Sequence, residues 1–189
     1  MRLNRTPVWF RFGLLCLGLS ANPASAVQVI RADAAYEKGV FRIYFEALLA
    51  APMPDVAAVL GDYAHFDKLD SRIRRVELLK PEADGVVLMR TRINACAGVF
   101  CRTVERVERV QRVPGGQVAK VIPERSDMRR GVATTHWRQE GTGTVVRYEA
   151  EFEPDFWVPA LISQRYGVKE MRESTLQMFK NVERAANVR

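Results

Sequence analysis

The chain contains two histidines, whose imidazole rings can act as acids, bases or metal ligands. His65 lies between Asp62 and Asp67. A neighbouring carboxylate can orient an imidazole ring, so His65 is a candidate general base or metal ligand. The structural alternative is a surface histidine at the start of a helix that Asp62 caps. His136 lies in a predicted strand, where it is either an acid or base in a cavity or a solvated side chain. Both interpretations depend on where the fold places the two rings.

The other reactive residues form no known catalytic pattern. The sequence contains no nucleophile elbow, glycine-rich phosphate loop, His-Glu-x-x-His motif or double cysteine pair. Cys96 and Cys101 would supply only half of a zinc site, and their spacing is not that of a thioredoxin-like motif. Arg90 and Glu149 are candidates for polar groups whose pKa is shifted by a pocket, but strand alternation places them mostly away from the apolar face. The sequence thus predicts no catalytic residue, no metal site and no cofactor.

The first 26 residues have the pattern of a secretory signal peptide. Three arginines precede the short apolar run Phe12–Leu19, and Ala24-Ser25-Ala26 matches a cleavage site. Cleavage there would leave a mature chain that starts at Val27, most simply in a bacterial periplasm. A lipoprotein anchored through Cys16 is the alternative, although the residue before this cysteine is a leucine rather than a small residue.

Cleavage would change the charge balance of the working protein. The full chain carries a formal charge of +7, and loss of three arginines and no acidic residue lowers it to +4. The remaining arginines are interleaved with glutamates, which is typical of a solvated face and not of a nucleic-acid interface. The length left after cleavage suits one domain spanning 27–189, which we expect to be a monomer.

The elements that must position these residues begin with a strand. Alternating apolar and polar residues predict it over Tyr36–Ala50. Helical spacing over Val56–Tyr63 and again over Phe66–Leu69 predicts two short helices after this strand. The turn signal Asp84-Gly85 predicts a hairpin further on. The later predicted strands are Ile73–Lys80, Val87–Ala95, Val99–Val113, Gln117–Ile122, Gly131–Glu140 and Thr144–Glu153.

Two stretches have less usual patterns. Valines repeat every three residues from Val104 to Val113, which fits neither a strand nor a straight helix, and a strand with a bulge is favoured over a helix. After the break at Pro154–Pro159, one long helix is predicted to reach Ala186, with an apolar stripe that packs on the sheet or forms a coiled coil. Gly167 would mark a kink or a close approach to the sheet. The order predicts an antiparallel sheet curved around a long terminal helix.

Several short stretches in this order resemble one known superfamily. The matching stretches are 51–60, Asp62–Phe66, Gly131–Trp137, Gly143–Tyr148 and Pro154–Pro159. Together they resemble the START-like (SRPBCC) helix-grip proteins, and most of all an exported member of the coenzyme Q-binding / polyketide cyclase and lipid transport branch. The resemblance covers roughly Tyr36 to Ala186. It implies an α+β fold in which six to seven antiparallel strands wrap around the C-terminal helix.

The resemblance also implies a cavity between the sheet and the helix for a lipid, quinone, sterol or polyketide. The residues expected to line it are Val87, Met89, Thr91, Ile93, Trp137, Tyr148, Phe152, Leu161, Ile162, Tyr166 and Met171. The alternative is that these side chains form an ordinary closed core. If the cavity is present, its mouth is expected where Phe156 and Trp157 lie near the loop Glu124–Arg130. This place is suited to transient contact with a membrane surface.

Two functions from different classes follow from this resemblance. The first is an exported protein that binds and carries a hydrophobic ligand without changing it. The second is an enzyme, similar to a cyclase or dehydrase, that acts on an apolar polyketide-like substrate. An enzyme requires a polar group with a tuned pKa in the pocket, so the carrier is the favoured function.

Cys96 and Cys101 are expected to form a disulfide. In one straight strand the two residues would lie ~16 Å apart, too far for a bond. A two-residue turn at Gly98-Val99 pairs Cys96 with Cys101 instead, and glycine at the first central position suits a type II′ turn. An oxidising compartment outside the cytoplasm would favour the bond.

Overall fold

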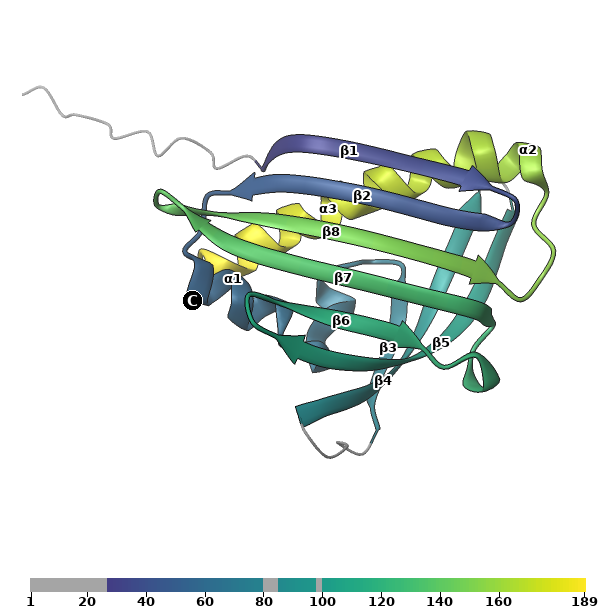
Figure 1. The fold of residues 1–189 in the computed structure, drawn as a ribbon, viewed down its shortest axis with the longest axis horizontal. Helices are drawn as coiled ribbons and strands as arrows, with labels where there is room; N and C mark the ends of the chain where they lie inside the picture. The colour runs from purple at the N-terminus through teal and green to yellow at the C-terminus, as the bar shows by residue number, and fades with distance from the viewer. Residues whose placement is uncertain (1–26, 80–84, 98–99) are drawn as a thin grey trace, which may run out of the picture.

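The computed structural model of the protein describes residues 27–79, 85–97 and 100–189. Eight antiparallel strands form one curved sheet in the order β1-β2-β8-β7-β6-β5-β4-β3 (Figure 1). The strands are β1 (Gln28–Glu37), β2 (Val40–Leu49), β3 (Ile73–Leu78), β4 (Val86–Ala97), β5 (Phe100–Val113), β6 (Gly116–Val121), β7 (Met128–Glu140) and β8 (Gly143–Pro154).

The helices lie on one face of this sheet (Figure 1). Between β2 and β3 the chain forms α1 (Met53–Leu60) and a 3₁₀ helix over Tyr63–Lys68. A short 3₁₀ turn, Pro123–Arg125, connects β6 to β7. The C-terminal segment contains α2 (Ala160–Ile162), a π-helical turn over 163–167, and α3 (Val168–Ala186). Within the described ranges, none of these helices is long and apolar enough to cross a membrane.

The packed core lies under the C-terminal half of α3. On β2, Phe45 and the other alternate residues are buried, and the Phe45 ring stacks on Phe179 of α3 with 5.1 Å between the ring centroids. The Glu183 carboxylate accepts a hydrogen bond from the Ala50 backbone N–H at 2.7 Å, which holds the helix to the end of β2. The Asn181 amide also donates to the Leu69 carbonyl at 2.9 Å. The N-terminal half of α3 therefore covers the sheet beyond this core.

The predicted fold class is confirmed, with eight strands rather than six to seven. The additional strand is β1, which pairs with β2 at the edge of the sheet. Its apolar residues Ile30, Ala32, Ala34 and Tyr36 alternate with Arg31, Asp33 and Glu37, but none of its residues is fully buried, and this strand was not predicted. The two short helices consequently follow the second strand and not the first.

Two predicted details differ from the structure. β5 pairs with β4 from Val86↔Gln111 to Ala97↔Phe100 without a register shift, so the expected bulge is absent from this pairing. The terminal helix is not uniform, because the π-helical turn separates α2 from α3. Gly167 ends this turn, and a Cβ atom there would lie 3.0 Å from the Phe41 ring, which agrees with a close approach to the sheet. The predicted turn at Asp84-Gly85 lies partly outside the described residues.

Candidate functional site

A cavity of about 540 Å³ lies between the sheet and the C-terminal helical segment. Its volume falls within the range of about 300–1,000 Å³ that is typical of small-molecule sites. Apolar side chains make up most of the wall, including Phe41 of β2, Ile93 of β4 and Phe152 of β8. Met171 and Met178 of α3 close the opposite side. Methionine side chains adapt their shape, so this wall can fit apolar molecules of varied outline.

The structure brings six of the eleven predicted pocket residues together around this cavity. They are Met89, Ile93, Tyr148, Phe152, Ile162 and Met171. Among the others, Val87 packs with Tyr63 and Val110 in a small separate cluster. Thr91 is buried, and its hydroxyl donates a hydrogen bond to the backbone carbonyl of residue 106 at 3.4 Å. Trp137 belongs to the packed core. Strand alternation therefore identified the inner face of the sheet, but not which of its residues border the cavity and which are covered by other side chains.

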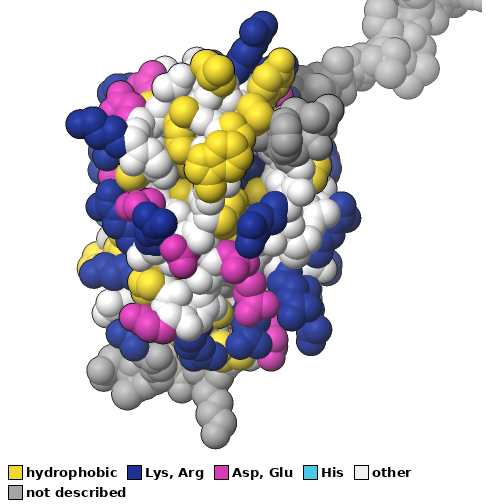
Figure 2. All heavy atoms as spheres, turned by 90° about the vertical axis from the view of Figure 1, so that its right-hand side faces the viewer, with side chains coloured by type: hydrophobic (Ala, Val, Ile, Leu, Met, Phe, Trp, Pro, Cys, Tyr) yellow, Lys and Arg dark blue, Asp and Glu magenta, His cyan; other side chains and the backbone are white. Residues whose placement is uncertain are grey.

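An exposed apolar patch lies where the cavity reaches the surface (Figure 2). Phe156 and Trp157 line the cavity, and Trp157 is also 84% exposed. Leu161 is 81% exposed and Tyr166 is 46% exposed, so these two predicted pocket residues lie on the outside of the molecule. The Arg102 guanidinium lies over the Phe156 ring, 4.3 Å from its centroid. This is the end of the cavity at which the sequence placed the mouth.

Charged side chains also line the cavity, and none of them was among the predicted pocket residues. On β5, Arg106 and Glu108 lie on the inner face between two valines, with 2.9 Å between Arg106 Nε and Glu108 Oε2. Before β3, the Arg72 guanidinium donates three hydrogen bonds to the Asp70 carboxylate, at 2.5, 3.0 and 3.2 Å. All four residues line the cavity. Two ion pairs therefore form polar regions in an otherwise apolar wall.

Tyr148 is the titratable group of the cavity that is most affected by its surroundings. Burial raises the pKa of its hydroxyl group to about 12, while Arg106 lowers it and Glu108 raises it. Weaker effects of Arg72 and Asp70 have opposite signs. At neutral pH the hydroxyl therefore keeps its proton and can donate a hydrogen bond.

The Tyr148→Phe variant should lose less stability than the parent protein in alkaline solution. The tyrosine pKa is about 10 in an unfolded chain, so between about pH 10 and 12 the folded state holds this proton more tightly. Its contribution is complete below pH 10 and disappears as the pH rises through the folded-state pKa of about 12. The difference should reach about 2–3 kcal/mol, measured by urea unfolding of both proteins along this range. Parallel pH profiles would contradict the assignment.

The four polar candidates from the sequence lie outside the cavity. The His65 ring is half-exposed, with Nδ1 2.9 Å from Asp62 Oδ1. Asp62 precedes the 3₁₀ helix but makes no side-chain cap, because its carboxylate pairs with this ring instead. His136 and Glu149 follow the outward-facing alternation of β7 and β8, and Arg90 forms ion pairs with glutamates on β3 and β5. Within the part of the chain that the structure describes, no cluster of ligands could hold a metal ion.

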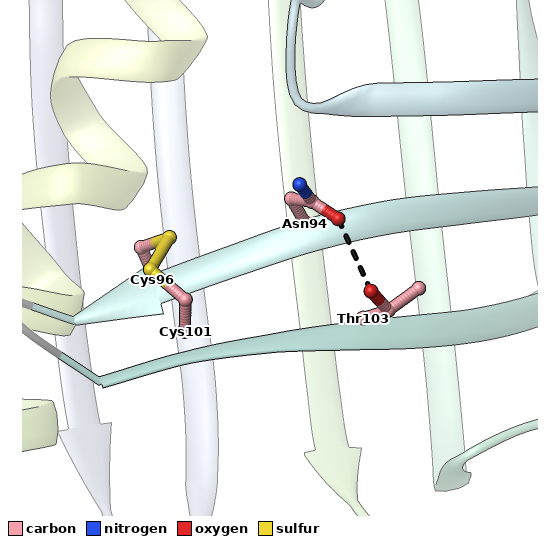
Figure 3. Close-up of a disulfide and its surroundings, with 4 residues drawn as sticks. All are labelled: Asn94, Cys96, Cys101 and Thr103. Atoms are coloured by element: carbon pink, nitrogen blue, oxygen red, sulfur yellow. Dashed lines mark hydrogen bonds between the residues drawn. A yellow bond between two sulfur atoms is a disulfide. The ribbon is translucent and has the colours of Figure 1, made fainter.

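The disulfide between Cys96 and Cys101 is present in the structure (Figure 3). The two residues are register partners on β4 and β5, with Cα atoms 4.1 Å apart, and both lie at the edge of the cavity. Two positions further from the tip, the Asn94 amide and the Thr103 hydroxyl are hydrogen-bonded at 3.2 Å. The turn proposed at Gly98-Val99 lies outside the described residues.

Replacing both cysteines by serine should lower the free energy of unfolding by only about 2 kcal/mol, because the bond closes a very short loop. The two cysteines are 5 residues apart in the sequence. Urea unfolding of the two proteins measures this difference. Thiol titration of the denatured, unreduced protein without residues 1–26 should find no free thiol, and two free thiols would rule out the bond.

The fold resembles that of several solved structures. The STAR-related lipid transfer protein of Xanthomonas axonopodis is 18% identical with a TM-score of 0.61, and the match covers 81% of this chain and 98% of that chain. A START superfamily protein of Mycobacterium smegmatis is 13% identical, with a TM-score of 0.63 and coverages of 78% and 97%. The Zhui aromatase/cyclase of Streptomyces sp. R1128 is 17% identical, with a TM-score of 0.59 and coverages of 79% and 96%. At these identities, the likeness demonstrates the fold alone.

The comparison with family models shows to which family the chain belongs. A search of curated proteins finds no match to the sequence. The model described as polyketide cyclase / dehydrase and lipid transport matches residues 41–182, which include every strand except β1 and most of α3. Together with the START-like fold, this match confirms the resemblance to the polyketide cyclase and lipid transport branch, although it does not test export. The chain belongs to the polyketide cyclase / dehydrase and lipid transport family.

Proposed function

We propose that the protein binds a small hydrophobic molecule in the cavity and carries it without changing it. The cavity of about 540 Å³ supports this function most directly, because its wall is mostly apolar and it lies next to a core that is otherwise closely packed. The family description names lipid transport, and one similar structure is named a lipid transfer protein. A buried volume of this size costs packing contacts, which an apolar ligand restores.

The polar groups of the cavity favour a carrier over an enzyme. Acid–base catalysis is most effective when the pKa of the catalytic group lies near the working pH. Tyr148, with a pKa of about 12, is far from that condition. Both histidines lie away from the cavity wall, so no imidazole reaches a bound ligand from the described residues. The aromatase/cyclase likeness keeps the enzyme as the alternative that an experiment has to exclude.

We place this carrier outside the cytoplasm, in a bacterial periplasm. The pattern of residues 1–26 supports export, although these residues lie outside the described part of the structure. The disulfide supports it too, because such bonds persist in oxidising compartments. Intact mass of the exported protein decides the cleavage site. A mass that starts at Val27 supports this assignment, whereas a retained Cys16 with added diacylglycerol would establish a lipoprotein.

The patch at the mouth suits collection of the ligand from a membrane. Trp157 and Leu161 are both more than four-fifths exposed, and Trp157 also lines the cavity. Aromatic side chains at such a position interact favourably with the boundary between lipid and water. Arg165, beside Tyr166, adds a positive charge next to the patch. An apolar molecule could then pass from a bilayer to the cavity with little exposure to water.

Mass spectrometry of solvent extracts tests the proposed function. The protein purified from its native compartment should release a hydrophobic molecule in near-stoichiometric amount. The same molecule, added back to emptied protein, should raise the melting temperature and be recovered unchanged. Empty extracts, together with no response to quinones, sterols, phospholipids or fatty acids, would refute binding. Recovery of a chemically altered molecule would establish the enzyme instead.

Filling the cavity should remove binding while the fold is kept. Ala133 of β7 lines the cavity, and Ala133→Trp places a large side chain inside it, so binding of the recovered ligand should weaken at least about tenfold. Val132 is the matched control, because it is the next residue on the same strand and is 40% exposed on the other face. Val132→Trp should leave binding unchanged. Equal binding by all three proteins, measured by titration calorimetry, would locate the ligand elsewhere.

A further inference from the structure

The first strand of the sheet lies outside the part of the chain that matches the family model. That match begins at residue 41, whereas β1 ends at Glu37 and forms one edge of the sheet (Figure 1). The pairing of β1 with β2 is regular from Arg31 to Glu37, and a bulge between Val29 and Arg31 interrupts it. The free side of this regular part is therefore a feature of this chain that the family model does not describe.

The turn after β1 determines which of its backbone groups are free. Lys38 and Gly39 form a two-residue turn with φ angles of 50° and 87°, and Glu37 pairs with Val40 across it. In such a hairpin the closing pair is hydrogen-bonded, and so is every second pair further along. The residues between these pairs, whose N–H and C=O groups point away from β2, are Ala32, Ala34 and Tyr36.

The backbone groups of these three residues form an open edge. No backbone group of the described residues bonds to them, because β1 is the last strand on its side of the sheet. Their side chains face inward, where Ala32 and Ala34 pack partly against the core. A row of free N–H and C=O groups next to small side chains can pair with a further strand. The charges along β1 indicate which strand fits.

The charges of the regular part are complementary to themselves about Ala34. Arg31 lies three residues before Ala34 and Glu37 lies three residues after it, and both side chains are more than three-fifths exposed. An antiparallel second copy of β1, with Ala34 opposite Ala34, places each arginine opposite the glutamate of the other copy. In the same register Ala32 lies opposite Tyr36, so the free backbone groups of both copies meet.

Other registers of the same pairing are less favourable. A two-fold axis at residue 33 would place the two Asp33 carboxylates opposite each other, and one at residue 35 would place Asp33 opposite Glu37. Like charges directly opposite each other destabilise a strand pair. An axis closer to the N-terminus would bring the bulge before Arg31 into the pairing. The charges and the bulge therefore select the register centred on Ala34.

We propose that β1 pairs antiparallel with β1 of a second copy of this chain, centred on Ala34, and forms a two-fold symmetric dimer with one sheet across both molecules. About six backbone hydrogen bonds and two arginine–glutamate pairs would join the copies. An interface this small predicts a weak dimer, with a Kd of roughly 10–100 μM. The dimer differs from the monomer expected from the sequence, and it does not depend on the proposed binding function.

Sedimentation velocity of the protein purified from its native compartment tests this dimer. From about 1 to 500 μM at low salt, the parent protein should change from monomer to mostly dimer. Arg31→Glu places a glutamate opposite Glu37 at both ends of the interface, so association should weaken at least about tenfold. The charge-exchanged variant Arg31→Glu/Glu37→Arg restores both pairs with opposite signs and should associate within about threefold of the parent.

A control variant separates the local effect from that of net charge. Arg138 on β7 is also exposed, so Arg138→Glu changes the net charge as much as Arg31→Glu does and should leave association unchanged. Circular dichroism and melting temperatures of all variants should match those of the parent, because the altered side chains are exposed.

Cysteine cross-linking tests the register and does not require charge reversal. In the proposed dimer, residue 33 of one copy lies opposite residue 35 of the other in a non-hydrogen-bonded pair, close enough for a disulfide. A mixture of differently tagged Asp33→Cys and Ala35→Cys proteins should therefore form a mixed disulfide under mild oxidation. Either variant alone should link poorly, because identical residues then lie about 7–8 Å apart across the axis.

The outcomes decide the proposal. A monomer at every concentration overturns it, and so does a dimer that Arg31→Glu leaves unchanged and that gives no mixed disulfide, because its contact then lies on another surface. Loss of association in Arg31→Glu, its recovery in the charge-exchanged variant and a mixed disulfide together establish the β1 interface. If Arg31→Glu folds poorly, the mixed disulfide decides alone.

Discussion

Replacing Phe179 by alanine should lower the free energy of unfolding by about 3–5 kcal/mol. The Phe179 side chain is fully buried and stacks on Phe45, with an angle of 15° between the rings. This contact joins α3 to the middle of β2. Its loss removes apolar burial and leaves a void that the surrounding sheet cannot fill.

Urea unfolding followed by circular dichroism measures this effect. Leu161→Ala is the matched control, because that side chain belongs to the same C-terminal segment but is 81% exposed, and its removal should change stability by less than about 0.5 kcal/mol. A Phe179→Ala variant that loses less than about 1 kcal/mol, roughly one quarter of the expected loss, would mean that α3 does not hold the sheet in this way.

The second large effect concerns the ion pair in the cavity wall. Glu108→Leu should lower the free energy of unfolding by about 3–5 kcal/mol, because it leaves the Arg106 guanidinium without its partner in a region with little water. Glu108 is only 3% exposed, so little water reaches the position of its carboxylate. Urea unfolding of the ligand-free protein measures this change.

The double variant Arg106→Met/Glu108→Leu provides the control for this prediction. It removes both charges and should recover most of the stability lost in Glu108→Leu, because no charge is left unpaired. The lost stability would then be due to an isolated charge rather than to a missing carboxylate. A double variant as unstable as the single variant would contradict this explanation and indicate that residue 108 acts mainly through packing.

The arginine and glutamate of the cavity could have been predicted from the sequence. A disulfide between Cys96 and Cys101 fixes the register of the hairpin, and the same register places Thr91 opposite Arg106 and Met89 opposite Glu108. Since Met89 was assigned to the inner face, its partner had to lie there too. The three-residue repeat of valines suggested a bulge, so the alternation of inner and outer residues was not applied to this strand. Arg72 and Asp70 carry no such signal, because they precede β3 in an irregular segment.

Other features could not be predicted, for physical reasons. The valines of β5 repeat every three residues because Val104 and Val110 are buried on the inner face while Val107 is buried on the other. A strand covered on both sides loses its period of two, and a bulge was the wrong explanation. β1 gives only a weak signal, because its period of two depends largely on the small residues Ala32 and Ala34, which are only partly buried against the core. The π-helical turn depends on contacts beyond its own sequence, such as that between Gly167 and Phe41.

The sheet order has a consequence for how the chain reaches its native state. The second strand of the chain pairs with the eighth, so Arg42 and Glu151, 109 residues apart, lie side by side. The Ala50–Glu183 hydrogen bond spans 133 residues. Such non-local contacts form late and give folding times of about milliseconds to seconds. During synthesis the first half of the chain has no complete core to fold around, so it stays open until β8 and α3 emerge. A chain of this topology is suited to being threaded through a membrane before it folds.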